Sequence, residues 1–306
     1  MRAAIVTVGI VVIVGSGGGS VSLLPEWDGP GGIPPTPLPT PLRVTVAPSR
    51  LVVQAGETAG FTAWARSGAT YQWRRDGVDI AGATGSTYTL TGANVGDDGA
   101  QFTAVASYGD ETATATSVLR VSPLPGVILE DTEFEMSDWS AAVLAAPPPS
   151  GPAVTVSQQL GYRRIVYEVP SWPTSVRIPV LHASLRSTYD PAVQGAILVV
   201  DYRQACIAPE GANPSFLYAR LMLEQGGRTF IAAGSQLCNA EWAPSSLYAQ
   251  RADEFVLLDG APGSPDFSAS GAPIRFGFIT QAEIAPSVGK ALSQGVDNWK
   301  VTVWRK

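Results

Sequence analysis

Short alternating segments separated by turn residues run through most of the chain. In "AGFTAWA", residues 59–65, Phe61, Ala63 and Ala65 share one face and the intervening residues take the other. Such period-two alternation is typical of strands with one buried face. Gly (32 residues) and Pro (25 residues) supply the turns. Helical periodicity is weak, and its best short candidate is "SSLYAQRADEF" at 245–255. The pattern therefore predicts an all-β fold.

The N-terminal 24 residues have the character of an export leader. "MRAAIVTVGIVVIV" carries one arginine followed by an apolar run that is short for a membrane span and suits the core of a secretory signal. The next residues, "GSGGGS", resemble the tether that follows the lipid-bearing cysteine of bacterial lipoproteins, but Ser16 stands where that cysteine would be. We predict an extracellular or cell-surface location in a bacterium. A retained membrane anchor is the alternative.

A proline-rich segment follows at residues 25–42, "PEWDGPGGIPPTPLPTPL". Alternating prolines favour extended polyproline II and exclude a sheet interior, so this segment is predicted to be a semi-rigid linker.

Charge and histidine content exclude several classes of function. The net charge is −6, from 20 basic and 26 acidic residues, and no basic stripe is present, so we expect no nucleic-acid partner. The single histidine, His182, excludes a multi-histidine zinc site. It lies in the apolar run "RIPVLHASL", which favours a structural role over that of a catalytic base.

The two cysteines, Cys206 and Cys238, both lie in the second half of the chain. An even pair in an exported protein predicts one disulfide.

Residues 43–121 contain short strands at regular intervals, the pattern of a small β-sandwich. "YQWRRDGVDIAGATGSTYTL" and "VGDDGAQFTAVAS" then resemble the immunoglobulin-like (Ig-like) domains of bacterial surface proteins. In this resemblance Trp73 matches the buried tryptophan of the third strand, and Phe102 follows the usual corner motif. Ala63 and Ala104 take the places of the family's two cysteines. The resemblance implies a spacer domain that is held together by packing around Trp73.

A second proline pair in "SPLPG", residues 122–126, is predicted to link this domain to a larger one at 127–306. The segments there are longer, and several are apolar on both faces. This pattern predicts a jelly-roll β-sandwich of two sheets packed face to face.

The two ends of the larger domain carry a second resemblance. "VILEDTEFEMSDW" and "GVDNWKVTVW" resemble the paired terminal segments of galactose-binding-like and lectin-like jelly rolls, which occur in carbohydrate-binding modules and secreted bacterial proteins. The resemblance implies a structural calcium ion (Ca2+) held by Glu135, Asp297 and Asn298, whose oxygens suit a hard cation. The alternative is that Asp297 and Asn298 form a polar turn.

Carbohydrate binding would use aromatic platforms with polar neighbours. Trp172, between prolines, and Trp242, shortly after Cys238, are the first candidates, with Tyr189 and Tyr218 behind them. The alternative for each ring is packing in or over the core, where large aromatic residues are mostly found.

A glycosidase is the competing enzymatic hypothesis. Glu133, Glu135 and Asp138 have the spacing of the carboxylates in retaining jelly-roll glucanases, and alternate strand residues would face the same way. The order of residue types differs from that family's motif, and the triplet lies at the edge of the domain.

Together these patterns predict an exported, non-catalytic surface or adhesion protein. An Ig-like spacer presents a jelly-roll domain that binds an extracellular polysaccharide or glycan, and self-association at the cell surface is a further expectation. The alternatives are a structural subunit of a surface layer or fibre, and a jelly-roll glycosidase.

Overall fold

The structure is a computed structural model that describes residues 40–144, 153–169, 175–209, 216–234, 236–284 and 290–306. The chain divides into two compact units, Met1–Pro41 and Leu42–Lys306. The predicted leader and almost all of the proline-rich linker lie outside the described residues. Within those residues, no helix has the length and apolar character needed to cross a membrane.

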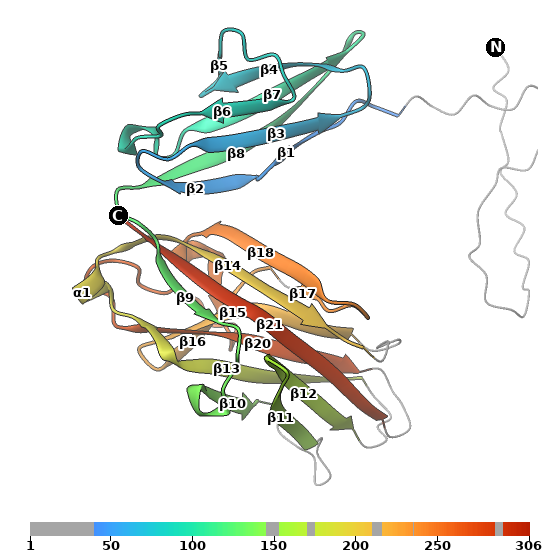
Figure 1. The fold of residues 1–306 in the computed structure, drawn as a ribbon, viewed down its shortest axis with the longest axis vertical. Helices are drawn as coiled ribbons and strands as arrows, with labels where there is room; N and C mark the ends of the chain where they lie inside the picture. The colour runs from blue at the N-terminus through green and yellow to red at the C-terminus, as the bar shows by residue number, and fades with distance from the viewer. Residues whose placement is uncertain (1–39, 145–152, 170–174, 210–215, 235, 285–289) are drawn as a thin grey trace, which may run out of the picture. The chain divides into compact units, whose positions relative to one another are not determined.

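Residues 44–122 form a small sandwich of two sheets (Figure 1). The first sheet has the order β1-β3-β6, with β1 at Val44–Ala47, β3 at Ala59–Ala65 and β6 at Thr87–Leu90. The second has the order β2-β8-β7-β4-β5, with strands at Arg50–Gln54, Glu111–Ser122, Gln101–Tyr108, Thr70–Arg75 and Val78–Asp79. β2 pairs with β8 in parallel, and the other pairs are antiparallel.

The core of this sandwich is aromatic and confirms the predicted Ig-like architecture. Trp73 is fully buried on β4, and its indole Nε1 donates to the backbone oxygen of Gly85 at 3.0 Å. Phe61 stacks on Phe102 with ring centroids 4.7 Å apart. Ala63 on β3 and Ala104 on β7 are both buried in this core, where their small side chains leave the volume to the rings.

Residues 127–305 form a larger sandwich. In its described part, a seven-stranded sheet has the order β10-β13-β20-β15-β16-β19, with β17 also pairing with β15. These strands span Trp139–Val143, Val176–Tyr189, Ile274–Ile284, Phe216–Gln225, Arg228–Ala232, Phe255–Leu257 and, for β17, Gln236–Leu237.

The facing sheet has the order β11-β12-β21-β14-β18, and β9 pairs with β21 to make it six-stranded in the described residues. Its strands span Ala153–Gln159, Tyr162–Val169, Lys290–Arg305, Ile197–Ile207, Ala243–Gln250 and, for β9, Val127–Asp131. The expected all-β fold of two sandwiches is confirmed. The helical candidate at 245–255 forms the end of β18, the short 3-10 helix η3 at Ala252–Glu254 and the first residue of β19.

β21 brings the two ends of the larger domain together. It crosses the sandwich as one long strand, drawn in red in Figure 1, and pairs with β9 from Trp299↔Asp131 to Val303↔Val127. Trp299 is fully buried and meets Trp139 edge to face with centroids 5.1 Å apart. The core role expected for one tryptophan of the last strand therefore falls to Trp299, while the indole of Trp304 donates to Asp201 at 2.9 Å.

Candidate ligand-binding surface

The predicted disulfide is confirmed. Cys206 on β14 bonds to Cys238, with the two Cα atoms 5.3 Å apart. Next to the bond, the backbone nitrogen of Ala208 donates to the oxygen of Asn239 at 2.6 Å. The bond thereby holds the segment that precedes β18 beside the end of β14.

Trp242 lies on that tethered segment and is packed on one side only. A Cβ atom at Gly295 would lie 3.0 Å from the Trp242 ring, 3.1 Å from the Tyr162 ring and 2.9 Å from Ile207, so only glycine lets these side chains approach β21 so closely. Tyr162 meets Trp242 edge to face with centroids 5.3 Å apart. Trp242 is still 40% exposed. One side of the indole is fixed by packing while part of it is open to solvent.

A shallow groove of about 380 Å³ lies along the outer face of the same sheet. Arg203 on β14 pairs in register with Lys300 on β21 and with Ser246 on β18. The Arg203 guanidinium lies 5.5 Å from the centroid of the Tyr248 ring, and the Lys300 ammonium is 3.0 Å from the Glu130 carboxylate. The remaining lining includes Thr132, Gln204, Ala205, Pro244, Ser245, Asn298 and Trp299.

The groove and the Trp242 ring belong to one face. Ile207 pairs with Gly295, and Ala205, two residues back along β14, pairs with Asp297. Strand residues two apart share a face at about 6.6–6.8 Å spacing, so Arg203 and Ile207 are about 13 Å apart along β14. The face thus carries a half-exposed tryptophan at one end and a polar groove with a tyrosine at the other.

Asp297 and Asn298 form a β-bulge inside β21, so the polar turn given as the alternative for this pair is a bulge within the last strand. The register between β14 and β21 shifts between Arg203 and Ala205, and Asn298 has a φ of 52°. An extra residue in one strand produces such a shift, and asparagine tolerates this left-handed conformation well. The Asp297 carboxylate accepts the Asn298 backbone N–H at 2.6 Å.

The residues expected to bind calcium lie in two segments of the larger sandwich. Glu135 is exposed at the start of the 3-10 helix η2, Met136–Asp138, and Asp297 and Asn298 lie in the bulge of β21. The described residues hold no group of three or more His, Cys, Asp or Glu side chains that could hold a metal ion. Calcium therefore stays a prediction of the sequence resemblance.

The other predicted aromatic platforms are placed differently. Tyr189 is fully buried, and its hydroxyl donates to the oxygen of Gly195 at 2.7 Å, so the expectation that it contacts a ligand is wrong. Tyr218 is half-buried on the outer face of the seven-stranded sheet, 6.3 Å from the Phe216 ring. Trp172 lies outside the described residues.

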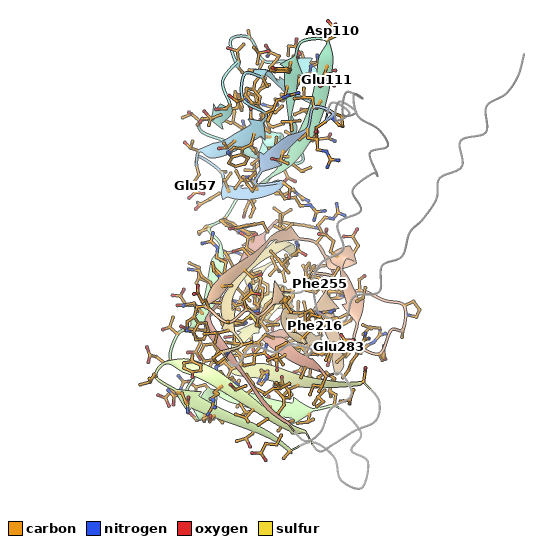
Figure 2. The ribbon with its side chains drawn as sticks, turned by 90° about the vertical axis from the view of Figure 1, so that its right-hand side faces the viewer. Glu57, Asp110, Glu111, Phe216, Phe255 and Glu283 are labelled. Carbon is orange, nitrogen blue, oxygen red and sulfur yellow. A yellow bond between two sulfur atoms is a disulfide. The ribbon has the colours of Figure 1, made fainter. Side chains whose placement is uncertain are left out.

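Phe216 is 49% exposed and pairs with Glu283 on β20, its neighbour in Figure 2. This patch is on the opposite sheet from Trp242, so the structure does not combine Tyr218 and Trp242 into one site.

Tyr162, Tyr248 and Arg203 were not predicted from the sequence as parts of a site. Tyr248 and Arg203 lie on half-buried strands whose outer faces alternate with core residues, and alternation alone does not indicate which sheet a strand joins. The pairing between β14, β18 and β21 brings them together across 45 residues or more of sequence.

The three carboxylates of the glycosidase hypothesis do not alternate along a strand. Glu133 and Glu135 are exposed in the segment between β9 and η2, and Asp138 ends η2. The Asp138 carboxylate is 2.8 Å from the guanidinium of Arg186. The geometry on which the hypothesis depends, two carboxyl groups on one strand face, is absent at these three residues.

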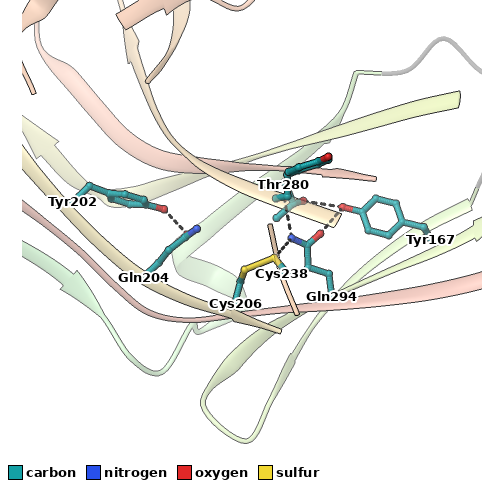
Figure 3. The surroundings of a disulfide bond; sticks show 8 residues. Tyr167, Tyr202, Gln204, Cys206, Cys238, Thr280 and Gln294 are labelled. Atoms are coloured by element: carbon teal, nitrogen blue, oxygen red, sulfur yellow. Dashed lines mark hydrogen bonds between the residues drawn. A yellow bond between two sulfur atoms is a disulfide. The ribbon is translucent and has the colours of Figure 1, made fainter. Parts of the chain in front are cut away.

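A chain of buried polar groups crosses the core of the larger sandwich. Arg163 Nε donates to His182 Nδ1 at 3.0 Å, and His182 Nε2 lies 3.0 Å from Thr280 Oγ1. The Tyr167 hydroxyl oxygen lies 3.0 Å from Thr280 Oγ1 and 3.3 Å from Gln294 Oε1. Its single hydrogen is donated to the Gln294 amide oxygen, and the Thr280 hydroxyl donates to Tyr167. Figure 3 shows Gln294 between Tyr167 and the disulfide, where its amide nitrogen is 3.1 Å from Cys238 Sγ.

This network keeps His182 neutral. Because Arg163 can only donate, Nδ1 of His182 accepts and Nε2 carries the proton. Burial, and then the positive charge of Arg163, hold the pKa of His182 well below its usual value. Burial also lowers the pKa of Arg163 to about 10, against the opposing effect of the Asp131 carboxylate. The expectation of a structural histidine agrees with this position, stacked 4.6 Å from the Phe278 ring centroid.

Comparisons with known proteins identify no family. No family model matches the chain, and no curated protein matches it. Among solved structures, the "N-terminal four Ig domains" of Dscam1 isoform 8.4 match at 24% identity and a TM-score of 0.25, covering 26% of this chain and 21% of that chain. A structure titled "Structural basis for Dscam isoform specificity" matches at 25% identity and the same TM-score and coverage. This chain thus spans about a fifth of the length of the structures it matches. The Ig-like fold of residues 44–122 follows from its own strand pairing.

Proposed function

We propose that this chain is a non-catalytic cell-surface protein whose larger sandwich binds an extracellular glycan through the outer face of its six-stranded sheet. The Ig-like sandwich acts as a spacer. The single observation that carries the proposal is the packing of Trp242, which is braced by Tyr162 and Gly295 and remains 40% exposed.

The chemistry of a sugar suits this face. One side of a pyranose ring is apolar and stacks on an aromatic ring, while its hydroxyl groups need fixed polar partners. Trp242 and Tyr248 offer rings, and Arg203, Ser246 and Lys300 offer hydrogen-bonding groups between and beside them. Because Trp242 is held before any ligand arrives, little conformational entropy is lost on binding.

The groove is also open and shallow, as an extended polymer requires. A small metabolite is normally enclosed over most of its surface. A polysaccharide instead lies along a face that allows the chain to enter and leave at both ends, and the strip between Tyr248 and Trp242 has this form.

The test is a glycan array probed with the full chain, followed by calorimetric titration of the best-binding oligosaccharide. Trp242→Ala should weaken that affinity at least about tenfold, since a central aromatic contact commonly contributes about 2 kcal/mol or more. Trp64→Ala is the matched control, because Trp64 is a 54% exposed tryptophan on the Ig-like sandwich. It should leave binding unchanged.

Two results would overturn the proposal. One is an array without any bound glycan. The other is equal affinity of the Trp242→Ala and Trp64→Ala chains for the glycan that is found, since the ligand would then lie elsewhere.

A further inference from the structure

The edges of the larger sandwich differ in how they are protected against pairing with another strand. An edge strand exposes unpaired N–H and C=O groups, and proteins normally blunt such edges with short strands, charges, prolines or bulges. At one edge of the six-stranded sheet, β18 contains Pro244 and Ala249 with a φ of 49°, and its pairing with β14 shifts in register. At the edges of the seven-stranded sheet, β19 has three residues and β10 has five.

The six-stranded sheet has two further edge strands, β9, which carries Glu130 and Asp131, and β11, which has none of these protections. β11 has seven residues, "AVTVSQQ", without a charge or a proline. All seven pair with β12 in unbroken register, from Ala153↔Glu168 to Gln159↔Tyr162. Among the described residues, no strand pairs with its other side.

The strand is also firmly held in place. Val154 and Val156 pack against the main core of the sandwich, and the side-chain amide of Gln158 donates to the oxygen of Glu133 at 2.7 Å. A regular strand held in this way presents its outer backbone groups as a straight template for one more strand.

We propose that β11 pairs with β11 of a second copy of this chain, antiparallel and about a two-fold axis, so that the two six-stranded sheets become one. A two-fold contact must be self-complementary. With Val156 on the axis, Thr155 faces Ser157 of the second copy and Ala153 faces Gln159, so no charged side chain meets its like. The proposal does not rest on the proposed glycan site, although Gln159 of β11 accepts a hydrogen bond from the Tyr162 hydroxyl at 3.0 Å.

The experiment measures the oligomeric state of the full chain by sedimentation equilibrium over a range of concentrations. The native chain should form a dimer. Thr155→Lys combined with Ser157→Lys places two like-charge pairs across the axis and should weaken the dimer about tenfold. Thr155→Lys combined with Ser157→Glu is the matched control. It changes the same two positions but gives opposite-charge pairs, and it should dimerise at least as well as the native chain.

Amide hydrogen exchange gives a second readout at the strand itself. As concentration rises, every second backbone amide between 153 and 159 should gain protection, because alternate N–H groups point outward from an edge strand. A chain that stays monomeric up to about 1 mM would overturn the proposal, since weaker pairing falls outside the affinities of specific contacts. So would a dimer that tolerates the double lysine change and leaves these amides unprotected.

Discussion

In both sandwiches two sheets pack face to face, but different interactions hold the sheets together. In the Ig-like sandwich, rings of Phe61, Trp73 and Phe102 fill the space between the sheets, and alanines stand at Ala63 and Ala104. In the larger sandwich, a disulfide and a chain of buried polar groups accompany the apolar core. The first depends on packing volume. The second depends on groups that must be bonded or neutral, so it should respond to reductant where the first does not, and to pH just below neutrality through His182.

The largest expected effect is on the aromatic core of the Ig-like sandwich. Trp73→Ala removes a fully buried indole and should lower the free energy of unfolding of this sandwich by about 3–5 kcal/mol, from lost burial and the cavity that remains. This loss is measured by urea unfolding, monitored separately in each sandwich through the hydrogen exchange of its backbone amides. Trp64→Ala, on the exposed face of the opposite sheet at β3, should cost far less. Equal losses for both variants would show that Trp73 does not hold the two sheets together.

The next effect belongs to the larger sandwich alone. Replacing Cys206 and Cys238 by alanine opens a loop with a sequence separation of 32 residues. Loop-closure entropy assigns such a bond about 3–4 kcal/mol. Urea unfolding should shift for the larger sandwich and not for residues 44–122, because both cysteines of the chain are in this bond.

The same change should reduce glycan binding, since the bond holds the segment that carries Trp242 beside β14. An unchanged unfolding curve for the larger sandwich would contradict the comparison between the two cores.

The sequence predicted the Ig-like sandwich better than the ligand-binding face, and the physical reason is locality. Trp73 and Phe102 were placed in the core because the short segments around them resemble the motifs of Ig-like domains. Trp242 was named as a candidate because it lies shortly after Cys238. The residues that pack against Trp242 were not predicted. Tyr162, Gly295 and Ile207 are distant in sequence and come together only because β12, β21 and β14 are neighbours in the sheet. Tyr189 was misjudged for the same reason, since its burial depends on strands distant in sequence.

The smallest expected effect is the pH dependence of the larger sandwich. The pKa of His182 is lowered by burial in the folded state, and its ordinary value of about 6.5 applies when the chain unfolds. As pH falls below about 6.5, the unfolded chain binds a proton that the folded chain does not. The free energy of unfolding should therefore fall by up to about 1.4 kcal/mol per pH unit, and should be unaffected by His182 above pH 7.

The physical cause can be tested with His182→Gln. Protonated His182 would turn an N–H toward Arg163, so a donor would face a donor and a positive charge would face another. Glutamine keeps an acceptor and a donor at about the same place but binds no proton. Urea unfolding at pH 7.5 and at pH 5.5 should then differ less for the variant than for the native chain. Burial raises the pKa of Asp201, which is present in both chains. Its contribution therefore cancels when the pH difference of the variant is subtracted from that of the native chain. The same pH difference in both chains would mean that the polar chain through this core does not depend on a neutral histidine.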